Sequence, residues 1–449
     1  MKLLKDKLFI KSMLSIAIPI ALQNLVTSSL NMVDSLMTSS LGQSSIAAVG
    51  LANQIFFFYI LLVFGIGTGS SVFISQYWGK NDILNIRKVL GIAILVSAVT
   101  GVIFTVAGVF FPEVLMKFFI DTPVIVKIGS DYLKIVALSY IVTAISFVLS
   151  VGLRSTGSPD VPLKVSIVAF FTNTFFNYIL MFGKMGLPAM GVKGAALGTL
   201  IARLVEISLL TYSIYSTKGP LTATFNELFG WEKEFLIKYF KTASPVIVNE
   251  GLWSLGQVMY SVAYAKIGEE ATAAVQIVTT IQNVFFVIVR GLANASTVMI
   301  GNKVGKGEED EAFDYAVKFL LISSAIGMLL GISMIFTSDL TLKLFRNLEP
   351  GLYSSAKKML IVMGLVFFVK TFNSTVIVGV FRGGGDTRYS MFLEMGSVWL
   401  VGVPMAFLGA LVFKLPVYWV VALVNLEDII KAIIAVPRVI SKKWIKNVT

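Results

Sequence analysis

Long apolar stretches, separated by short polar connections, run through almost the entire chain. A bilayer core of about 30 Å requires about 20 apolar residues in one helix. By this measure the pattern predicts twelve membrane-spanning helices, at residues 13–40, 46–74, 89–111, 133–153, 163–183, 191–215, 239–265, 271–300, 315–337, 356–380, 390–412 and 416–437. With 56% hydrophobic and only 14% charged residues, the chain is too apolar for a soluble core. The predicted fold class is therefore an all-α polytopic membrane protein.

The twelve predicted helices fall into two sets of six, because the sequence repeats itself. A single ungapped shift superimposes Pro19 on Pro245, Gly42 on Gly268, Gly65 on Gly291, and Gly79-Lys80 on Gly305-Lys306. Further along, GLRSTGSPD around Arg154 matches VFRGGGDTR around Arg382 with a slightly longer shift. An even number of spans in each half makes the two halves parallel repeats, as in transporters that rock two bundles against each other.

The longest polar connection lies between the two halves. Gly, Pro, Thr and charged residues interrupt the apolar pattern over residues 216–240, where an amphipathic helix on the membrane surface would fit. We therefore expect an N-terminal six-helix lobe at 1–215, a cytoplasmic connection at 216–238 and a C-terminal six-helix lobe at 239–449.

The charged and reactive residues exclude several classes of function. The chain has no His and no Cys, which excludes disulfides, thiolate metal sites and a histidine switch. It has no Walker A pattern, no HExxH zinc motif and no nucleophile with a histidine base, so we expect neither an enzyme nor a cofactor. The net charge of +12 is attributed to Lys and Arg on the cytoplasmic side of the membrane rather than to nucleic-acid binding. Most Lys and Arg fall on that side if the N-terminus and every second loop are cytoplasmic, so both termini are expected in the cytoplasm.

Asp34, Glu206, Glu250 and Glu394 are acidic residues inside the predicted spans. An acid near the bilayer centre costs about 2.5 to 3.5 kcal/mol on insertion scales, so each needs a partner, a water-filled cavity or a function. For Asp34 the repeat offers Tyr260 at the equivalent position, so symmetry does not require an acid and a functional role is favoured. Glu206 lies three residues after Arg203, and the two side chains could simply neutralise each other.

The sequence does not identify the partners of the acids in the second half. Glu250 follows Asn249 and corresponds to Asn24, so polarity is repeated at this depth and a cavity-facing position is favoured. Glu394 lies near the cytoplasmic end of its span, where access to solvent explains it equally well. Lys370 and Arg290 also fall inside spans and are candidate counter-ions for these acids.

Arg382 precedes three consecutive glycines at the cytoplasmic end of the tenth span. The glycines are expected to break the helix there. We expect Arg382 and Asp386 to form a solvated pair at the membrane surface, with a role in gating as the alternative.

A candidate site comes from the fifth and sixth spans. Asn173 and Asn177 are four residues apart and share one helical face, and Thr199 adds a hydroxyl from the next span. With the carboxylate of Asp34, such oxygens suit a hard cation, so that Asp34, Asn173 and Asn177 are candidate Na⁺ ligands. Hydrogen bonding between helices is an equally good explanation of the two asparagines.

The sequence resembles the multidrug and toxic compound extrusion (MATE) family. The resemblance rests on the opening P-x-x-x-Q-N…D…LG, on GTGSSVFISQYWGKND after the second span and on FRGGGDTRYS after the tenth. It implies a cation-coupled antiporter that exports organic compounds by alternating access between two lobes. It is closest to bacterial and archaeal members with an acid in the first span, which implies an N-lobe site of Asp34, Asn173, Asn177 and Thr199.

Two departures from the family pattern concern the coupling ion. Members with an acid in the first span often have Asp where Asn177 stands. Sodium-coupled relatives carry Glu in the seventh span and Asp in the tenth, whereas here Glu250 is displaced by about one turn and the tenth span has Lys370 and Asn373. The coupling ion, Na⁺ or H⁺, therefore stays open.

The expected function is export of amphipathic, cationic organic compounds from a multi-pass protein of the cell inner membrane that acts as a monomer. The alternative is a flippase for lipid-linked precursors from the same superfamily. A flippase would be expected to carry several basic residues in its N-lobe cavity to hold a phosphate, and away from the ends of its spans this half offers only Arg203, beside Glu206. A membrane scaffold without transport activity does not explain acids inside the spans.

Overall fold

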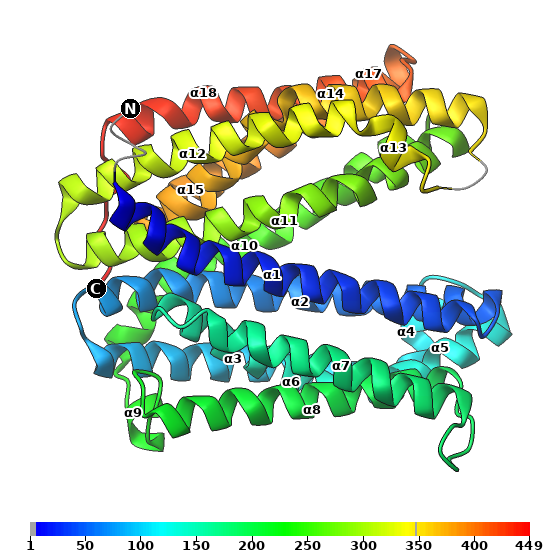
Figure 1. Cartoon of the computed structure of the whole chain (residues 1–449), viewed down its shortest axis with the longest axis horizontal. Helices are drawn as coiled ribbons and strands as arrows, with labels where there is room; N and C mark the ends of the chain where they lie inside the picture. The colour runs from blue at the N-terminus through cyan, green and yellow to red at the C-terminus, as the bar shows by residue number, and fades with distance from the viewer. Residues whose placement is uncertain (1–5, 346–347) are drawn as a thin grey trace. The chain divides into compact units, whose positions relative to one another are not determined.

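The computed structural model describes residues 6–345 and 348–449, which form helices joined by short connections (Figure 1). The α-helices are α1 (Lys7–Ser39), α2 (Gln43–Gly79), α3 (Ile83–Phe110), α4 (Pro112–Lys117), α5 (Pro123–Val136), α6 (Leu138–Ser155), α7 (Asp160–Phe182), α8 (Val192–Thr217), α9 (Phe225–Phe229), α10 (Lys233–Ala265), α11 (Glu269–Gly305), α12 (Glu309–Phe336), α13 (Ser338–Leu342), α14 (Pro350–Ser374), α15 (Thr387–Ser397), α16 (Val403–Phe407), α17 (Val417–Val424) and α18 (Leu426–Ile440). Three segments have the wider winding of a π-helix: η2 (Thr375–Arg382), η3 (Val398–Gly402) and η4 (Leu408–Val412).

Ten helical segments in the described part of the chain are long and apolar enough to cross a membrane. They correspond to ten of the twelve predicted spans. The other two predictions coincide with α10 and with the consecutive helices α17 and α18. These two are not among the ten because α10 is interrupted by polar residues, among them Glu250, and because α17 and α18 are only 8 and 15 residues long.

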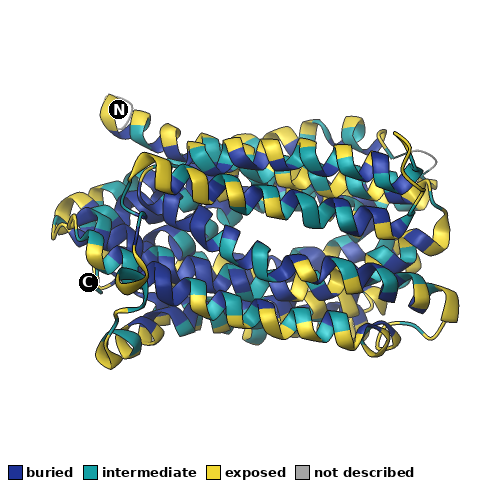
Figure 2. Cartoon of the chain, turned by 90° about the horizontal axis from the view of Figure 1, so that it is seen from below, coloured by how far each residue is buried: buried dark blue, intermediate teal, exposed yellow. Residues whose placement is uncertain are grey.

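The helices bury one face and expose another. Figure 2 shows buried and exposed residues alternating along the same helices. Large apolar side chains are prominent among the exposed residues, for example Phe110, Phe336, Leu400 and Ile440. A soluble monomer does not expose apolar surface on this scale, whereas a bilayer is itself an apolar solvent for it. The exposed apolar faces are therefore the lipid-facing surface.

The chain divides into two compact units that do not coincide with the halves of the sequence. The N-terminal unit contains Leu22–Ile74 and Asn81–Ala243, and the C-terminal unit contains Met1–Ala21, Ser75–Lys80 and Ser244–Thr449. In the N-terminal unit α7 packs along α8, and α3 packs against α6 and α9. In the C-terminal unit α12 packs along α14 (Figure 1), and α11 packs against η2 and α14.

The repeated Gly-Lys pairs have a structural reason inside the C-terminal unit, where the end of α2 meets the end of α11. A Cβ atom at Gly79 would lie 2.1 Å from the carbonyl oxygen of Asn302, and one at Gly305 would lie 1.9 Å from that of Gln76. The repeat superimposes Gln76 on Asn302, so the contact is two-fold symmetric. Glycine is required on both sides because the two backbones touch.

The connection between α8 and α10 is ordered on the surface of α3. Arg87 of α3 donates to the carbonyl oxygen of Pro220 over 3.2 Å and forms a 2.5 Å ion pair with Glu227 of α9. The backbone amide and hydroxyl of Thr224 also donate to Glu227, closing a capping box at the start of α9. These hydrogen bonds from Thr224, with Arg87, hold the pKa of Glu227 below its usual range.

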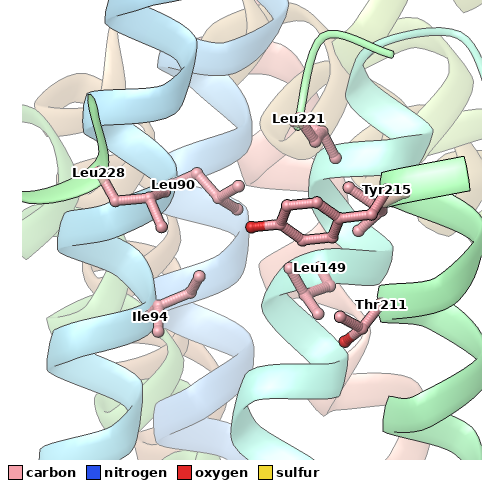
Figure 3. A pocket seen from close by; sticks show the side chains of 8 residues that line it. Leu90, Ile94, Leu149, Thr211, Tyr215, Leu221 and Leu228 are labelled. Carbon is pink, nitrogen blue, oxygen red and sulfur yellow. The ribbon is translucent and has the colours of Figure 1, made fainter. Parts of the chain in front are cut away.

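A small apolar pocket lies under this connection. It has a volume of about 50 Å³, and Figure 3 shows side chains of α3, α6, α8 and the connection around it. Its one hydroxyl-bearing aromatic side chain, Tyr215, donates to the carbonyl oxygen of Ala223 over 2.9 Å. Ligand pockets usually measure about 300–1,000 Å³. This pocket is therefore a packing gap rather than a binding site for an organic substrate.

Replacing Gly91 of α3 by alanine is expected to destabilise the N-terminal unit, although alanine usually stabilises a helix by about 0.5–1 kcal/mol relative to glycine. A Cβ atom at Gly91 would lie 2.0 Å from the carbonyl oxygen of Leu228. Forcing the two backbones apart should cost about 1–3 kcal/mol, measured as a lower unfolding midpoint in detergent. Gly50→Ala is the matched control, because no atom lies within 4 Å of its added Cβ. Equal midpoints for the two variants would contradict this expectation.

Candidate functional site

The four residues expected in the N-lobe site form one continuous chain of hydrogen bonds in the N-terminal unit. The amide nitrogen of Asn177 donates to Asp34 Oδ1 over 2.7 Å and to Asn173 Oδ1 over 3.0 Å. The amide nitrogen of Asn173 in turn lies 3.3 Å from the hydroxyl of Thr199. Three helices, α1, α7 and α8, therefore meet at this site, and the two asparagines lie on one face of α7 as their spacing predicted.

Close packing of α7 against α8 fixes the orientation of Asn177. The side chain is fully buried, and its Oδ1 atom has no hydrogen-bond partner in the described part of the chain. A Cβ atom at Gly198 would lie only 2.1 Å from this oxygen, so any side chain at position 198 would displace that of Asn177. The amide nitrogen of Asn177 thus donates to the carboxylate of Asp34, while the Oδ1 atom of Asn177 stays available as an acceptor.

Arg203 lies one turn after Thr199 on α8 but is bonded to a different acid. Its Nη1 lies 2.6 Å from Glu206 Oε2, so the predicted pair between neighbouring turns is present. Asp34 receives a hydrogen bond from Asn177 and none from a cationic group in the described residues. The site therefore contains two carboxylates and one guanidinium, which leaves one negative charge without a bonded counter-ion.

Apolar and aromatic side chains surround the helices that carry this site. One buried cluster joins Tyr59, Tyr132 and Tyr140 with residues from α7 and α8, and Met37 of α1 and Leu41, just after α1, pack against it. The rings of Tyr59 and Tyr140 are stacked with their centroids 4.9 Å apart. This environment has a low dielectric constant, which strengthens any interaction of Asp34 with a cation.

In the C-terminal unit, two of the predicted candidates share a single arginine. Arg382 of η2 lies 2.6 Å from Glu250 of α10 and 3.3 Å from Glu394 of α15. The amide of Asn249 also donates to Glu394 over 2.5 Å. Arg382 is only 3% exposed, so this is a buried ion network that joins three helical segments.

The expectation of a solvated Arg382–Asp386 pair at the membrane surface is wrong. Asp386 is 1% exposed and is bonded to two other cations, Arg438 and Lys446, each over 2.6 Å. The glycines between the two residues do break the helix, and Gly385 has a positive φ of 90°. That turn sends Arg382 and Asp386 to different partners, which a short sequence separation could not reveal.

Lys370 of α14 belongs to a second ion network in the C-terminal unit. Its Nζ lies 3.1 Å from Asp428 Oδ2, and the Nζ of Lys431 lies 3.7 Å from Asp428 Oδ1. Asn373 donates to Asp428 Oδ1 over 3.0 Å, and the hydroxyl of Tyr260 donates to Glu427. Arg290, the other expected counter-ion, is exposed and forms no salt bridge among the described residues.

Three members of this second network were missed by the sequence reasoning: Glu427, Asp428 and Lys431. The signal was present, because LEDIIK interrupts the last apolar stretch with three charged residues in five positions.

No group of three or more acidic residues able to hold a metal ion occurs in the described part of the chain. The hydrogen-bonded chain of Asp34, Asn177, Asn173 and Thr199 contains one carboxylate with neutral oxygen donors.

Comparison with known proteins gives the fold and the family. A crystal structure of MATE in complex with MaL6 superposes with a TM-score of 0.88 at 19% identity and covers 96% of this chain and 97% of that one. An outward-facing conformation of a multidrug resistance MATE family transporter of the MOP superfamily also gives 0.88, at 19% identity and 96% coverage of both chains. These likenesses confirm the predicted all-α membrane fold of two repeated halves.

Relatives in sequence cover nearly the whole chain. A probable multidrug resistance protein NorM of Thermotoga maritima is 26% identical over 412 residues, which is 90% of this chain and 86% of the relative. An uncharacterized transporter YisQ of Bacillus subtilis is 26% identical over 450 residues, which is 98% of this chain and 96% of the relative. A family model described as MatE matches residues 19–179 and 245–408, starting at the two prolines that the repeat superimposes. The chain therefore belongs to the MatE family, and like the other members of that family it is a membrane transporter rather than an enzyme.

Proposed function

We propose that this protein is a secondary antiporter that exports amphipathic, cationic organic compounds in exchange for Na⁺ or H⁺, with Asp34 as the coupling acid. The observation that carries the proposal is the carboxylate of Asp34, which is hydrogen-bonded by Asn177 and not by a cation. An acid inside a span costs free energy unless a cation or proton joins it. Asp34 is therefore suited to bind and release one.

The same atoms could serve either ion. The amide nitrogen of Asn177 lies between two acceptor oxygens, Asp34 Oδ1 and Asn173 Oδ1. If the side-chain amide of Asn177 rotated by half a turn, its Oδ1 would face Asp34 Oδ1 and Asn173 Oδ1. Three oxygen atoms would then surround one position, and Na⁺ favours such sets of oxygen ligands. A proton would instead bind to Asp34 alone, with Asn177 holding the carboxyl group in place.

Alternating access of the two lobes would couple this site to the substrate. Export of organic compounds is supported by the relatives named multidrug resistance proteins.

We also propose that the protein acts as a monomer in the cell inner membrane. Both termini would lie in the cytoplasm, because the excess of Lys and Arg falls on that side of the predicted spans.

The flippase alternative gains no support from the N-terminal unit. A phosphate group would require several basic side chains. Arg203 is bonded to Glu206, and Arg154 donates to the carbonyl oxygen of Ser150 and lies over the ring of Phe147. Each of the two arginines contacts residues near it in the sequence, and the two do not form a shared phosphate site.

Transport into proteoliposomes under imposed Na⁺ or H⁺ gradients, with a panel of cationic dyes, tests the proposal. If Na⁺ is the coupling ion, Asn177→Ala should lower both the rate and its Na⁺ dependence, because one ligand is lost. If H⁺ is the coupling ion, a pH gradient alone should drive export, and Asn177→Ala should leave its pH profile in place. Dye movement that responds to neither gradient would refute secondary antiport.

A further inference from the structure

The second ion network of the C-terminal unit occupies the repeat-equivalent position of the Asp34 site. The shift that takes Pro19 to Pro245 takes Asp34 to Tyr260. The slightly longer shift that takes Arg154 to Arg382 takes Thr199 to Glu427 and Arg203 to Lys431. In the first half the acid, Asp34, is on the first span and the hydroxyl of Thr199 is on the sixth. In the second half the positions are exchanged: the hydroxyl of Tyr260 is on the seventh span and the acid, Glu427, is on the twelfth.

Contacts elsewhere in the two units support these shifts. Gln23 donates to Ser166 over 3.1 Å, and the shifts convert this pair into Asn249 and Glu394, which are hydrogen-bonded over 2.5 Å. Gly157 and Gly385, related by the longer shift, both have a positive φ, of 83° and 90°. The two clusters are therefore versions of one site.

The two versions differ in their charge. The cluster around Asp34 has one negative charge in excess of its arginine. The C-terminal cluster contains two carboxylates, Glu427 and Asp428, and two ammonium groups, Lys370 and Lys431. It is neutral without any ion from solution.

The oxygen atoms around these lysines resemble a cation site. Asp428 and Lys431 are 6% and 4% exposed, and Asn373 is 3% exposed with its Oδ1 unpartnered in the described part of the chain. Carboxylate and amide oxygens are ligands of hard cations. The lysine ammonium groups are themselves cations, and they lie within 3.1 and 3.7 Å of the Asp428 oxygens.

We propose that the C-terminal unit carries a cation-binding site whose occupants are its own side chains, the ammonium groups of Lys370 and Lys431. The site would bind Na⁺ if a lysine were removed, because Asp428 would then be a buried carboxylate with too few counter-ions. If Asp34 couples transport as proposed above, it follows that one cation is exchanged in each cycle, through the N-terminal unit alone.

The test is Na⁺-dependent thermal unfolding of the full chain in detergent at pH 8, comparing NaCl with choline chloride at equal ionic strength. All variants carry Asp34→Asn, which silences the N-terminal site and makes the result independent of the proposed coupling. Lys370→Met should gain a saturable rise of the midpoint with NaCl, since a ligand that binds only the folded state stabilises it. Adding Asp428→Asn should abolish the gain.

Lys358→Met is the matched control, because Lys358 is an exposed lysine of the same helix that lies over the Tyr418 ring and not beside an acid. It should respond to Na⁺ no more than the Asp34→Asn background. If the Lys370→Met protein aggregates in choline chloride, recovery of folded protein in NaCl is the equivalent positive result. Aggregation in both salts, an unchanged Na⁺ response, or a response that survives Asp428→Asn would overturn the proposal.

Discussion

Replacing Asp34 by asparagine is expected to reduce gradient-driven export to the level of empty liposomes while the protein still folds and inserts. The substitution removes the only carboxylate in the hydrogen-bonded chain of Asp34, Asn177, Asn173 and Thr199. Asparagine keeps an oxygen that can accept the hydrogen bond from Asn177, so the helices should stay in place. Removing a charge from a span also lowers its insertion cost.

The measurement is substrate movement in proteoliposomes at matched protein density, with the yield and unfolding midpoint of each variant recorded. Asp160→Asn is the control, since Asp160 is an acid of the same unit paired with Lys164 at the surface, where the pair is about half exposed or more. It should transport as the unmodified chain does, because exposed ion pairs contribute little. Full export by Asp34→Asn, or equal losses in both variants, would refute the assignment of Asp34.

The N-terminal site could be predicted from the sequence because its key spacings are local. Asn173 and Asn177 lie on one face of any helix, and Arg203 and Glu206 are neighbours on theirs. The meetings of Asn173 with Thr199 and of Asp34 with Asn177 join residues on different helices, and the family resemblance supplied those pairings. The repeat, read as a constant shift, likewise indicated two six-helix halves.

The ion networks of the C-terminal unit could not be predicted in this way. Arg382 meets Glu250 from 132 residues away, and nothing in the local sequence connects them. Glu427, Asp428 and Lys431 were hidden inside an apolar stretch that was interpreted as one span, whereas the structure divides it into α17 and α18. Charge pairing between distant helices depends on tertiary packing, which spacing and hydropathy do not encode.

Replacing Arg382 by methionine is expected to be the most destabilising single change in the C-terminal unit. Arg382 is 3% exposed and is the cation bonded to both Glu250 and Glu394. Breaking a buried ion pair by removing one partner costs about 3–5 kcal/mol, because an uncompensated buried charge remains. The measurement is the free energy of unfolding by denaturant in detergent micelles. Arg388→Met, an exposed arginine six residues further along, should change it by less than about 0.5 kcal/mol.

A charge-free version of the same network separates the cost of unpaired charge from the loss of packing. In the variant that combines Arg382→Met with Glu250→Gln and Glu394→Gln, no buried carboxylate lacks a counter-ion, and the amide of Asn249 can still donate to the glutamine that replaces Glu394. Replacing a buried ion network by neutral side chains of similar volume is often close to neutral in stability. We therefore expect the triple variant to recover most of the stability that Arg382→Met loses. If it is instead as unstable as the single variant, the methionine fails by packing, and Arg382 stabilises the unit through its shape rather than its charge.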